Sequence, residues 1–281
     1  MHHDYRVIVI GGGHAGVEAA WAVANILASH SQAHNAASQV ALITLDPFKI
    51  GVMSCNPAIG GLAKGQLVRE IDAMGGLMGL ATDAAGIQFK VLNATKGPAV
   101  HGPRAQCDKH LYAETIQRMI ASRSEIKVFA GSVESLQVEG SRITGITIKG
   151  APRPHAPSAA ANDTPDWSRL AHWPDGTMTL AAPAVVLTTG TFMRGLMHTG
   201  ESQTPGGRHG ESAASAISTA LSSLGFELGR LKTGTPPRLR RGSIRWDDLD
   251  DAPGDVVPLP FSDLTAEPGS HTPRITPSHA S

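Results

Sequence analysis

The stretch that decides the fold runs from Tyr5 to Gly16 and reads YRVIVIGGGHAG. Its first half is rich in β-branched residues and predicts a short, buried parallel strand. Three glycines follow in a Gly-x-Gly-x-x-Gly pattern, and an alanine-rich helical segment (17–28) follows the glycines. A strand, a glycine turn and a helix in this order predict the first part of a Rossmann βαβ unit.

Each glycine of the turn has its own expected task. Gly11 permits the sharp exit from the strand, Gly13 lets the backbone approach a pyrophosphate, and Gly16 lets the helix pack against the sheet. Backbone N–H groups at the helix N-terminus face the phosphate charge, and His14 is either near that phosphate or simply the start of the helix. The expected pyrophosphate loop comprises Gly11, Gly12, Gly13, His14, Ala15 and Gly16.

A second apolar strand is predicted at 40–45, and it closes with Asp46 after a polar connection at 29–38. A carboxylate at this point can accept a hydrogen bond from an adenosine ribose. The alternative is an ordinary turn residue in front of Pro47. Both interpretations stay open from the sequence.

A third strand, AVVLTTG at 184–190, follows a small β-meander predicted at 127–149 with a turn at 139–141. Flavoproteins of the two-dinucleotide type return to their FAD domain in this way, which favours FAD over NAD and adds Thr189 and Gly190 to the cofactor site. Any buried strand followed by a turn would look similar. The expected fold class is α/β, with an FAD-binding Rossmann-like domain of the glutathione-reductase type, a β-meander and a partial second domain.

The remaining segments suggest a division into contiguous ranges. We expect an FAD-binding domain at 1–200 with a flexible insertion at 151–172, the start of a substrate-side or NAD-side domain at 201–250, and a proline-rich disordered tail at 251–281. Further expectations are loops at 46–61 and 93–103 and helices near 67–78, 104–122 and 211–224. The first of these helices has an apolar stripe of Leu67, Val68, Ile71, Met74 and Met78.

Charge and cysteine usage exclude several classes of protein. Lys and Arg number 24, as do Asp and Glu, so the net charge is zero and any nucleic-acid surface must be a local patch. Two cysteines make no disulfide framework, and no spacing of residues predicts a metal site. Apolar runs are too short to span a membrane, and a reducing, cytoplasmic location is expected. The dense basic cluster consists of Arg230, Lys232, Arg238, Arg240 and Arg241, and it either binds RNA phosphates or is a solvated face.

Cys55 lies in a polar loop with Pro57 and two glycines, shortly before a predicted helix, and Lys64 is nearby in the sequence. A helix N-terminus and a nearby cation favour a reactive thiolate. The plain alternative is a small buried apolar residue. Cys107 is expected on the 104–122 helix, facing the core.

Four strings of residues resemble the tRNA uridine 5-carboxymethylaminomethyl modification enzymes, the MnmG (GidA) family. They are MSCNPAIGG (53–61), GIQF (86–89), LNATKGPAV (92–100) and RLKTGTPPR (230–238), and the resemblance extends from residue 5 to about 245. It implies an FAD enzyme that modifies C5 of the tRNA wobble uridine. It also implies methylenetetrahydrofolate as the one-carbon donor, NADH as the reductant, and a homodimer that works with an MnmE-type GTPase.

The resemblance also assigns three residues. Cys55 matches a catalytic cysteine, whose role as nucleophile or as acid or base stays open. Val133 matches a position whose backbone meets the adenine end of FAD. Pro205 stands where the family often has a serine near the flavin, so only a backbone contact would persist.

Members of the family are longer than this chain, so an N-terminal fragment is expected. Two alternatives remain beside the tRNA-modifying enzyme: a catalytically incomplete FAD-binding remnant, and a generic flavin oxidoreductase of small molecules. The strings around Cys55 and Lys96 count against the generic oxidoreductase, since such an enzyme has no need of them.

Overall fold

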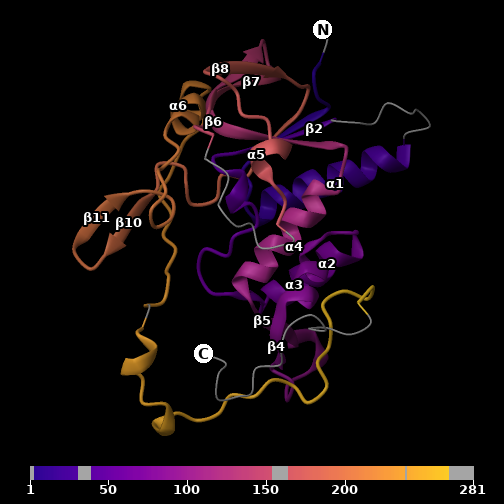
Figure 1. The fold of residues 1–281 in the computed structure, drawn as a ribbon, viewed down its shortest axis with the longest axis vertical. Coiled ribbons are helices and arrows are strands. Elements are labelled where there is room, and N and C mark those ends of the chain that lie inside the picture. The colour runs from indigo at the N-terminus through magenta and orange to yellow at the C-terminus, as the bar shows by residue number, and fades with distance from the viewer. Residues whose placement is uncertain (1–2, 31–38, 154–163, 238, 266–281) are drawn as a thin grey trace. The chain divides into compact units, whose positions relative to one another are not determined.

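The computed structural model describes residues 3–30, 39–153, 164–237 and 239–265. The chain forms two compact units (Figure 1), which we call the first unit (Met1–Gly51 with Ile116–Arg230) and the second unit (Val52–Thr115 with Leu231–Ser281). The expected contiguous ranges, 1–200 and 201–250, therefore differ from the division in the structure. The reason is that the chain leaves the first unit after its second strand, builds a separate small sheet, and then returns.

A six-stranded sheet forms the first unit, in the order β8-β7-β6-β2-β1-β9. Its strands are β1 (Val7–Ile10), β2 (Val40–Thr44), β6 (Ile126–Glu139), β7 (Arg142–Gly150), β8 (Thr177–Ala181) and β9 (Val185–Leu187). β1 pairs in parallel with both β2 and β9, and β2 pairs in parallel with β6. The predicted return of the third strand beside β1 is thus confirmed, and the α/β fold class is confirmed with it.

Helix α1 (His14–His30) connects β1 to β2 and contacts both strands, which completes the predicted βαβ unit. It is longer than its alanine-rich part, because Ser29 and His30 are still helical. The rest of the expected 29–38 connection, residues 31–38, lies outside the described residues.

The β-meander is confirmed, with β6 as one long strand. Its first residues pair with β2, and from Gly131 onward it pairs with β7 in antiparallel fashion, with a bulge after Val133. The predicted turn at 139–141 contains Gly140, whose φ of +61° explains the glycine. Ile146 and Ile148 on β7 are buried, so the meander shares the core of the parallel strands.

The segment expected as a flexible insertion is partly packed. Residues 154–163 lie outside the described residues, but α5 (Trp167–Leu170) buries Trp167 completely. The indole N–H of Trp167 donates to the side-chain oxygen of Gln117 at 3.1 Å. His172 joins the sheet by donating to Val128 and accepting from Ala130. The expectation was therefore wrong for 164–172, because one large apolar side chain anchors this part.

The last part of the first unit contains a hairpin and a short helix. The hairpin joins β10 (Leu196–Thr199) to β11 (Ser202–Pro205), and α6 (Ala216–Ser223) packs on β6 (Figure 1). The helix predicted at 211–224 is therefore present in shortened form.

The second unit has an antiparallel sheet in the order β3-β5-β4, with bounds β3 (Ala58–Gly60), β4 (Gly86–Leu92) and β5 (Gly102–Cys107). The predicted 46–61 loop therefore ends in a strand and also holds a 3₁₀ turn at Pro47–Lys49. The predicted 93–103 loop connects β4 to β5 and includes a 3₁₀ turn at Pro98–Val100.

The second unit also contains α2 (Lys64–Ala73), α3 (Met78–Ala85) and the first half of α4 (Lys109–Ala121), whose residues from Ile116 onward belong to the first unit. The helix predicted at 104–122 begins later, because the Asp108 carboxylate accepts from the N–H groups of His110 and Leu111 and so caps α4. Cys107 consequently lies on β5, buried as expected but not on a helix.

The apolar stripe predicted for the first of these helices is only partly buried. Val68 faces the core, whereas Leu67 and Met74 are 55% and 78% exposed. The predicted helix near 67–78 is interrupted, because α2 ends at Ala73 and Met78 begins α3; Gly75, with a φ of +81°, lies between them.

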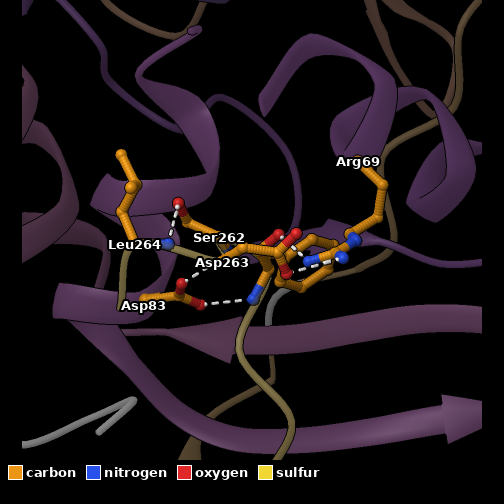
Figure 2. A network of polar contacts seen from close by, with 6 residues as sticks. Arg69, Asp83, Ser262, Asp263 and Leu264 are labelled. Carbon is orange, nitrogen blue, oxygen red and sulfur yellow. Dashed lines mark hydrogen bonds and ion pairs between the residues drawn. The ribbon is translucent and has the colours of Figure 1, made fainter. Parts of the chain in front are cut away.

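The described part of the proline-rich tail is packed within the second unit, against α2 and α3 (Figure 2). Phe261 is 0% exposed, and its N–H and that of Ser262 donate to the Asp83 carboxylate on α3. Arg69 on α2 donates to the Phe261 carbonyl and pairs with Asp263. The expected disordered tail is therefore wrong for 251–265, and residues 266–281 lie outside the described residues.

Candidate functional site

The glycine turn shows three different steric situations. A Cβ on Gly11, whose φ is +118°, would lie 2.3 Å from the Thr188 carbonyl oxygen, and a Cβ on Gly16 would lie 1.8 Å from the Gly11 carbonyl oxygen. A Cβ on Gly13 would meet nothing within 4 Å. Gly11 and Gly16 are therefore required by the turn itself, whereas Gly13 borders open space.

Gly12 belongs to the packed side of the same turn. A Cβ there would lie 2.8 Å from the Thr44 hydroxyl, and the Gly12 carbonyl accepts from the Gly51 N–H at 3.0 Å. Ala15 is exposed on the first turn of α1. Of these residues, Gly13 and Ala15 present the turn to the outside.

Thr188 is a residue of this site that the sequence analysis did not select. Its N–H and its hydroxyl both donate to the Ile10 carbonyl, each at 2.8 Å. These bonds join the end of β9 to the last residue of β1, directly before the glycine turn. The sequence signal for this residue was the pair of threonines, Thr188 and Thr189, at the end of the predicted strand. Thr189 and Gly190 follow, and Gly190 has a φ of +55° with open space where a Cβ would lie.

Asp46 has a local role in addition to its predicted one. Its carboxylate accepts from the Phe48 N–H at 2.9 Å and caps the 3₁₀ turn at Pro47–Lys49. This is the turn role that the sequence left open. The bond orients the carboxyl group just beyond β2, and a ribose contact stays a prediction.

These residues come together because parallel strands end at one edge of a sheet. The glycine turn follows β1, Asp46 follows β2, and Thr188 to Gly190 follow β9; we call this the carboxyl edge. Val133 lies on β6 three residues past Ala130, which pairs with Thr44 at the end of β2. Val133 is buried, and a contact of its backbone with a ligand stays a prediction. Ligands of open α/β sheets bind at this edge.

Pro205 is placed differently. It is exposed at the end of β11, opposite Leu196 in the hairpin. Gly207, two residues after Pro205, has a carbonyl that accepts from the Thr191 hydroxyl at 2.9 Å. Thr191 directly follows Gly190, so this bond links the Pro205 segment to the carboxyl edge. A flavin contact of Pro205 stays a prediction.

His14 and Arg208 form an electrostatic pair beside the turn. Burial lowers the pKa of the His14 imidazole, and the positive charge of Arg208 lowers it further. Arg208 is held by Glu211, with 2.8 Å between Nε and Oε1, and its guanidinium lies over the Phe192 ring at 5.5 Å. A neutral His14 leaves Arg208 as the nearby cation. Sequence reasoning missed Arg208, although it ends the Pro-Gly-Gly-Arg string.

The Cys55 thiol lies in the second unit against a segment distant in sequence. Its sulfur is 3.1 Å from the Thr235 hydroxyl oxygen and 3.6 Å from the Gly234 carbonyl oxygen. Cys55 is half-buried, so it is not the buried apolar residue of the alternative interpretation. Lys64 is exposed at the first position of α2.

The other cysteine contrasts with Cys55. Burial raises the pKa of the Cys107 thiol to about 12, and the Asp83 and Asp108 carboxylates add to this effect. At neutral pH Cys107 is a protonated packing residue, as expected.

The basic cluster is exposed where the structure describes it. Lys232, Arg240 and Arg241 belong to the second unit, and Arg238 lies outside the described residues. Arg230 belongs to the first unit and donates to the Arg194 carbonyl at 3.4 Å. The ion pairs found among the described residues do not involve Lys232, Arg240 or Arg241, whose charges remain available.

Two further classes of site are absent from the described ranges. No group of three or more His, Cys, Asp and Glu side chains there could hold a metal ion. None of the helices in those ranges has the length and apolar character needed to cross a membrane.

Comparison with known proteins gives consistent matches. The sequence model of the family described as glucose inhibited division protein A matches residues 6–156 and 174–274. The tRNA uridine 5-carboxymethylaminomethyl modification enzymes MnmG of Rhodopirellula baltica and Granulibacter bethesdensis are 43% and 46% identical to this chain, over 93% and 92% of its length. The crystal structure of Aquifex aeolicus GidA is 38% identical, with a TM-score of 0.76 over 94% of the chain. The chain spans 36% of the length of each of these two relatives and 38% of the Aquifex chain.

Proposed function

The chain belongs to the glucose inhibited division protein A (GidA) family, and we propose that it supplies the FAD site and the reacting thiol of a tRNA uridine-modifying flavoenzyme. The observation that carries this proposal is the pairing of two features in one chain. The carboxyl edge has open space at Gly13, and Cys55 lies against the threonine of a second family string. A generic flavoprotein needs only the first feature.

The residues of the carboxyl edge fit FAD. The space in front of Gly13 suits a pyrophosphate, and the N-terminus of α1 with Arg208 nearby offers it positive potential. Asp46 supports a ribose contact, the Val133 backbone supports an adenine contact, and Thr189, Gly190 and the Pro205 backbone complete the proposed site. FAD supplies the capacity to accept and transfer a hydride.

The proposed substrate is the wobble uridine of tRNA. In this proposal the Cys55 sulfur adds to the uracil ring and so activates C5; the alternative role is proton transfer at the same atom. Methylenetetrahydrofolate would supply the methylene carbon bonded to C5, an amino acid with the structure of glycine would supply the carboxymethylamino part, and NADH would supply the electrons. The two MnmG relatives are named for a carboxymethylaminomethyl modification of tRNA uridine, which supports this choice.

The same proposal includes partners and location. Lys232, Arg240 and Arg241 would contact tRNA phosphates, and Arg230 and Arg238 belong to the same stretch of sequence. An MnmE-type GTPase, a second copy of the chain and a cytoplasmic setting follow from the resemblance alone.

The cofactor part is tested by denaturing the purified chain and identifying the released flavin. We expect FAD; release of FMN alone, or of NAD with no flavin, would contradict the proposal. The reaction part is tested in cells that lack their own family member and carry the gene containing this sequence. Mass analysis of their tRNA should show carboxymethylaminomethyl-uridine, which Cys55→Ser should abolish and Cys107→Ser should not. Full modification with Cys55→Ser would make Cys55 a structural residue.

A further inference from the structure

We propose that Thr235 is a positioning residue for the Cys55 sulfur, holding it in place and favouring its ionised form. This inference rests on the proposed function, in which Cys55 is the reacting thiol. It concerns a contact between residues 180 positions apart, with 3.1 Å between the sulfur and the hydroxyl oxygen.

The two partners of the sulfur respond differently to its protonation state. In the thiol form, the S–H donates to the Gly234 carbonyl at 3.6 Å. In the thiolate form that bond is lost, and the sulfur becomes a charged acceptor for the Thr235 hydroxyl. Hydrogen bonds to charged groups are stronger than neutral ones. Thr235 therefore stabilises the reactive form, whereas Gly234 stabilises the resting form.

The chain restricts Thr235 before any substrate arrives. Threonine is branched at Cβ, so few side-chain rotamers are open to it. Pro236 follows, and the residue before a proline is confined to extended backbone conformations. A hydroxyl that is limited in both ways loses little entropy when it binds the sulfur.

Both segments of the contact belong to the second unit. On one side, the Cys55 loop is tied to β5 by the bond from the Cys107 N–H to the Pro57 carbonyl, at 2.7 Å. On the other side, the segment that carries Thr235 is held farther along. The Asp255 N–H donates to the Phe89 carbonyl on β4 at 2.8 Å, and Phe261 is anchored by Asp83. The Cys55 loop is therefore tied directly to the sheet, and the anchored part of the Thr235 segment begins 20 residues farther on, at Asp255.

The surroundings of Thr235 argue against a role in packing. Thr235 is exposed, and Leu231 in the same segment is 97% exposed. The hydroxyl therefore contributes little to burial, and its removal leaves no cavity in a core. Among the described residues, the polar contact of the Thr235 hydroxyl is with the Cys55 sulfur.

The test is the rate at which iodoacetamide alkylates Cys55 in the full chain, measured over a range of pH by peptide mass analysis. The thiolate sulfur displaces iodide from the reagent, so the rate reports the thiolate fraction. Thr235→Val should slow alkylation at neutral pH about tenfold and move the whole pH profile upward, as expected for one lost charge-assisted hydrogen bond. Thr235→Ser should restore the parent profile.

Thr233→Val is the matched control on the same segment and should leave the profile unchanged. An unchanged profile with Thr235→Val, a failure of Thr235→Ser to restore it, or an equal effect of Thr233→Val would each overturn the inference. The assay needs neither flavin nor tRNA. A failure of the proposed function would appear in the tRNA analysis and leave this result standing.

Discussion

Asp83 and Phe261, which are 178 positions apart in the sequence, are joined by a hydrogen bond of 2.8 Å from the Phe261 N–H to the Asp83 carboxylate (Figure 2). The second carboxylate oxygen accepts from the Ser262 N–H at 2.9 Å. Burial raises the pKa of Asp83, although these hydrogen bonds work against the rise. One buried side chain thus fastens a distant segment to α3.

Replacing this carboxyl group should release the segment. Asp83→Asn keeps the shape but turns an N–H group toward one of the two backbone donors. One buried donor is then unsatisfied, and we expect a loss of about 1–3 kcal/mol in the free energy of unfolding. Denaturant titration measures it. Asp263→Asn is the matched control, because the Asp263 side chain is 85% exposed in its pair with Arg69. This substitution should lower the free energy of unfolding by less than about 1 kcal/mol. Equal losses in both variants would contradict the anchoring role of Asp83.

Two alanine substitutions separate the roles of the glycines. Gly13→Ala adds a Cβ where nothing lies within 4 Å, so thermal stability without ligand should be nearly unchanged while bound FAD is lost. Gly16→Ala places a Cβ 1.8 Å from the Gly11 carbonyl oxygen, so it should lower stability by about 1–3 kcal/mol or more. Thermal unfolding and the absorbance of released flavin check both. Normal FAD retention by Gly13→Ala would place the pyrophosphate elsewhere.

Cys107 should make stability depend on alkaline pH. Its folded-state pKa of about 12 lies above its ordinary value of 9.0, so the folded chain holds this proton more tightly than the unfolded chain. The protonated Cys107 thiol contributes fully to the free energy of unfolding below about pH 9, and this contribution is lost as the pH rises toward 12. Denaturant titration from about pH 8 to about pH 10.5 should therefore show a decline in the free energy of unfolding. In Cys107→Ala this decline should be smaller over the same pH range. A decline of the same size in the variant would assign it to other groups.

Charge reversal tests the basic cluster. In Arg240→Glu with Arg241→Glu, tRNA binding should weaken, and the slope of log K against log salt should fall by about 2, since each phosphate contact contributes roughly 0.9. Arg142→Glu, an exposed arginine of the first unit, is the control and should keep the parent slope. A parent-like slope in the double variant would return the cluster to a solvated face.

Local sequence patterns determined the first half of the fold. The run of β-branched residues before Gly11, the glycine spacing and the helix after Gly16 specify a βαβ unit, because backbone sterics and side-chain periodicity act between near neighbours. The same reasoning located the β6–β7 turn at Gly140. It also assigned the glycine turn, Asp46 and Thr189 to one cofactor site.

Only the tertiary structure decided which distant segments meet. Trp167 and Phe261 lie in stretches whose composition suggests disorder, yet each is buried, because one large apolar side chain with a hydrogen-bond partner outweighs weak local propensity. The contact of Cys55 with Thr235 has the same origin. No spacing in the sequence encodes which hydroxyl approaches a sulfur 180 positions away; that depends on how the second unit packs the two segments.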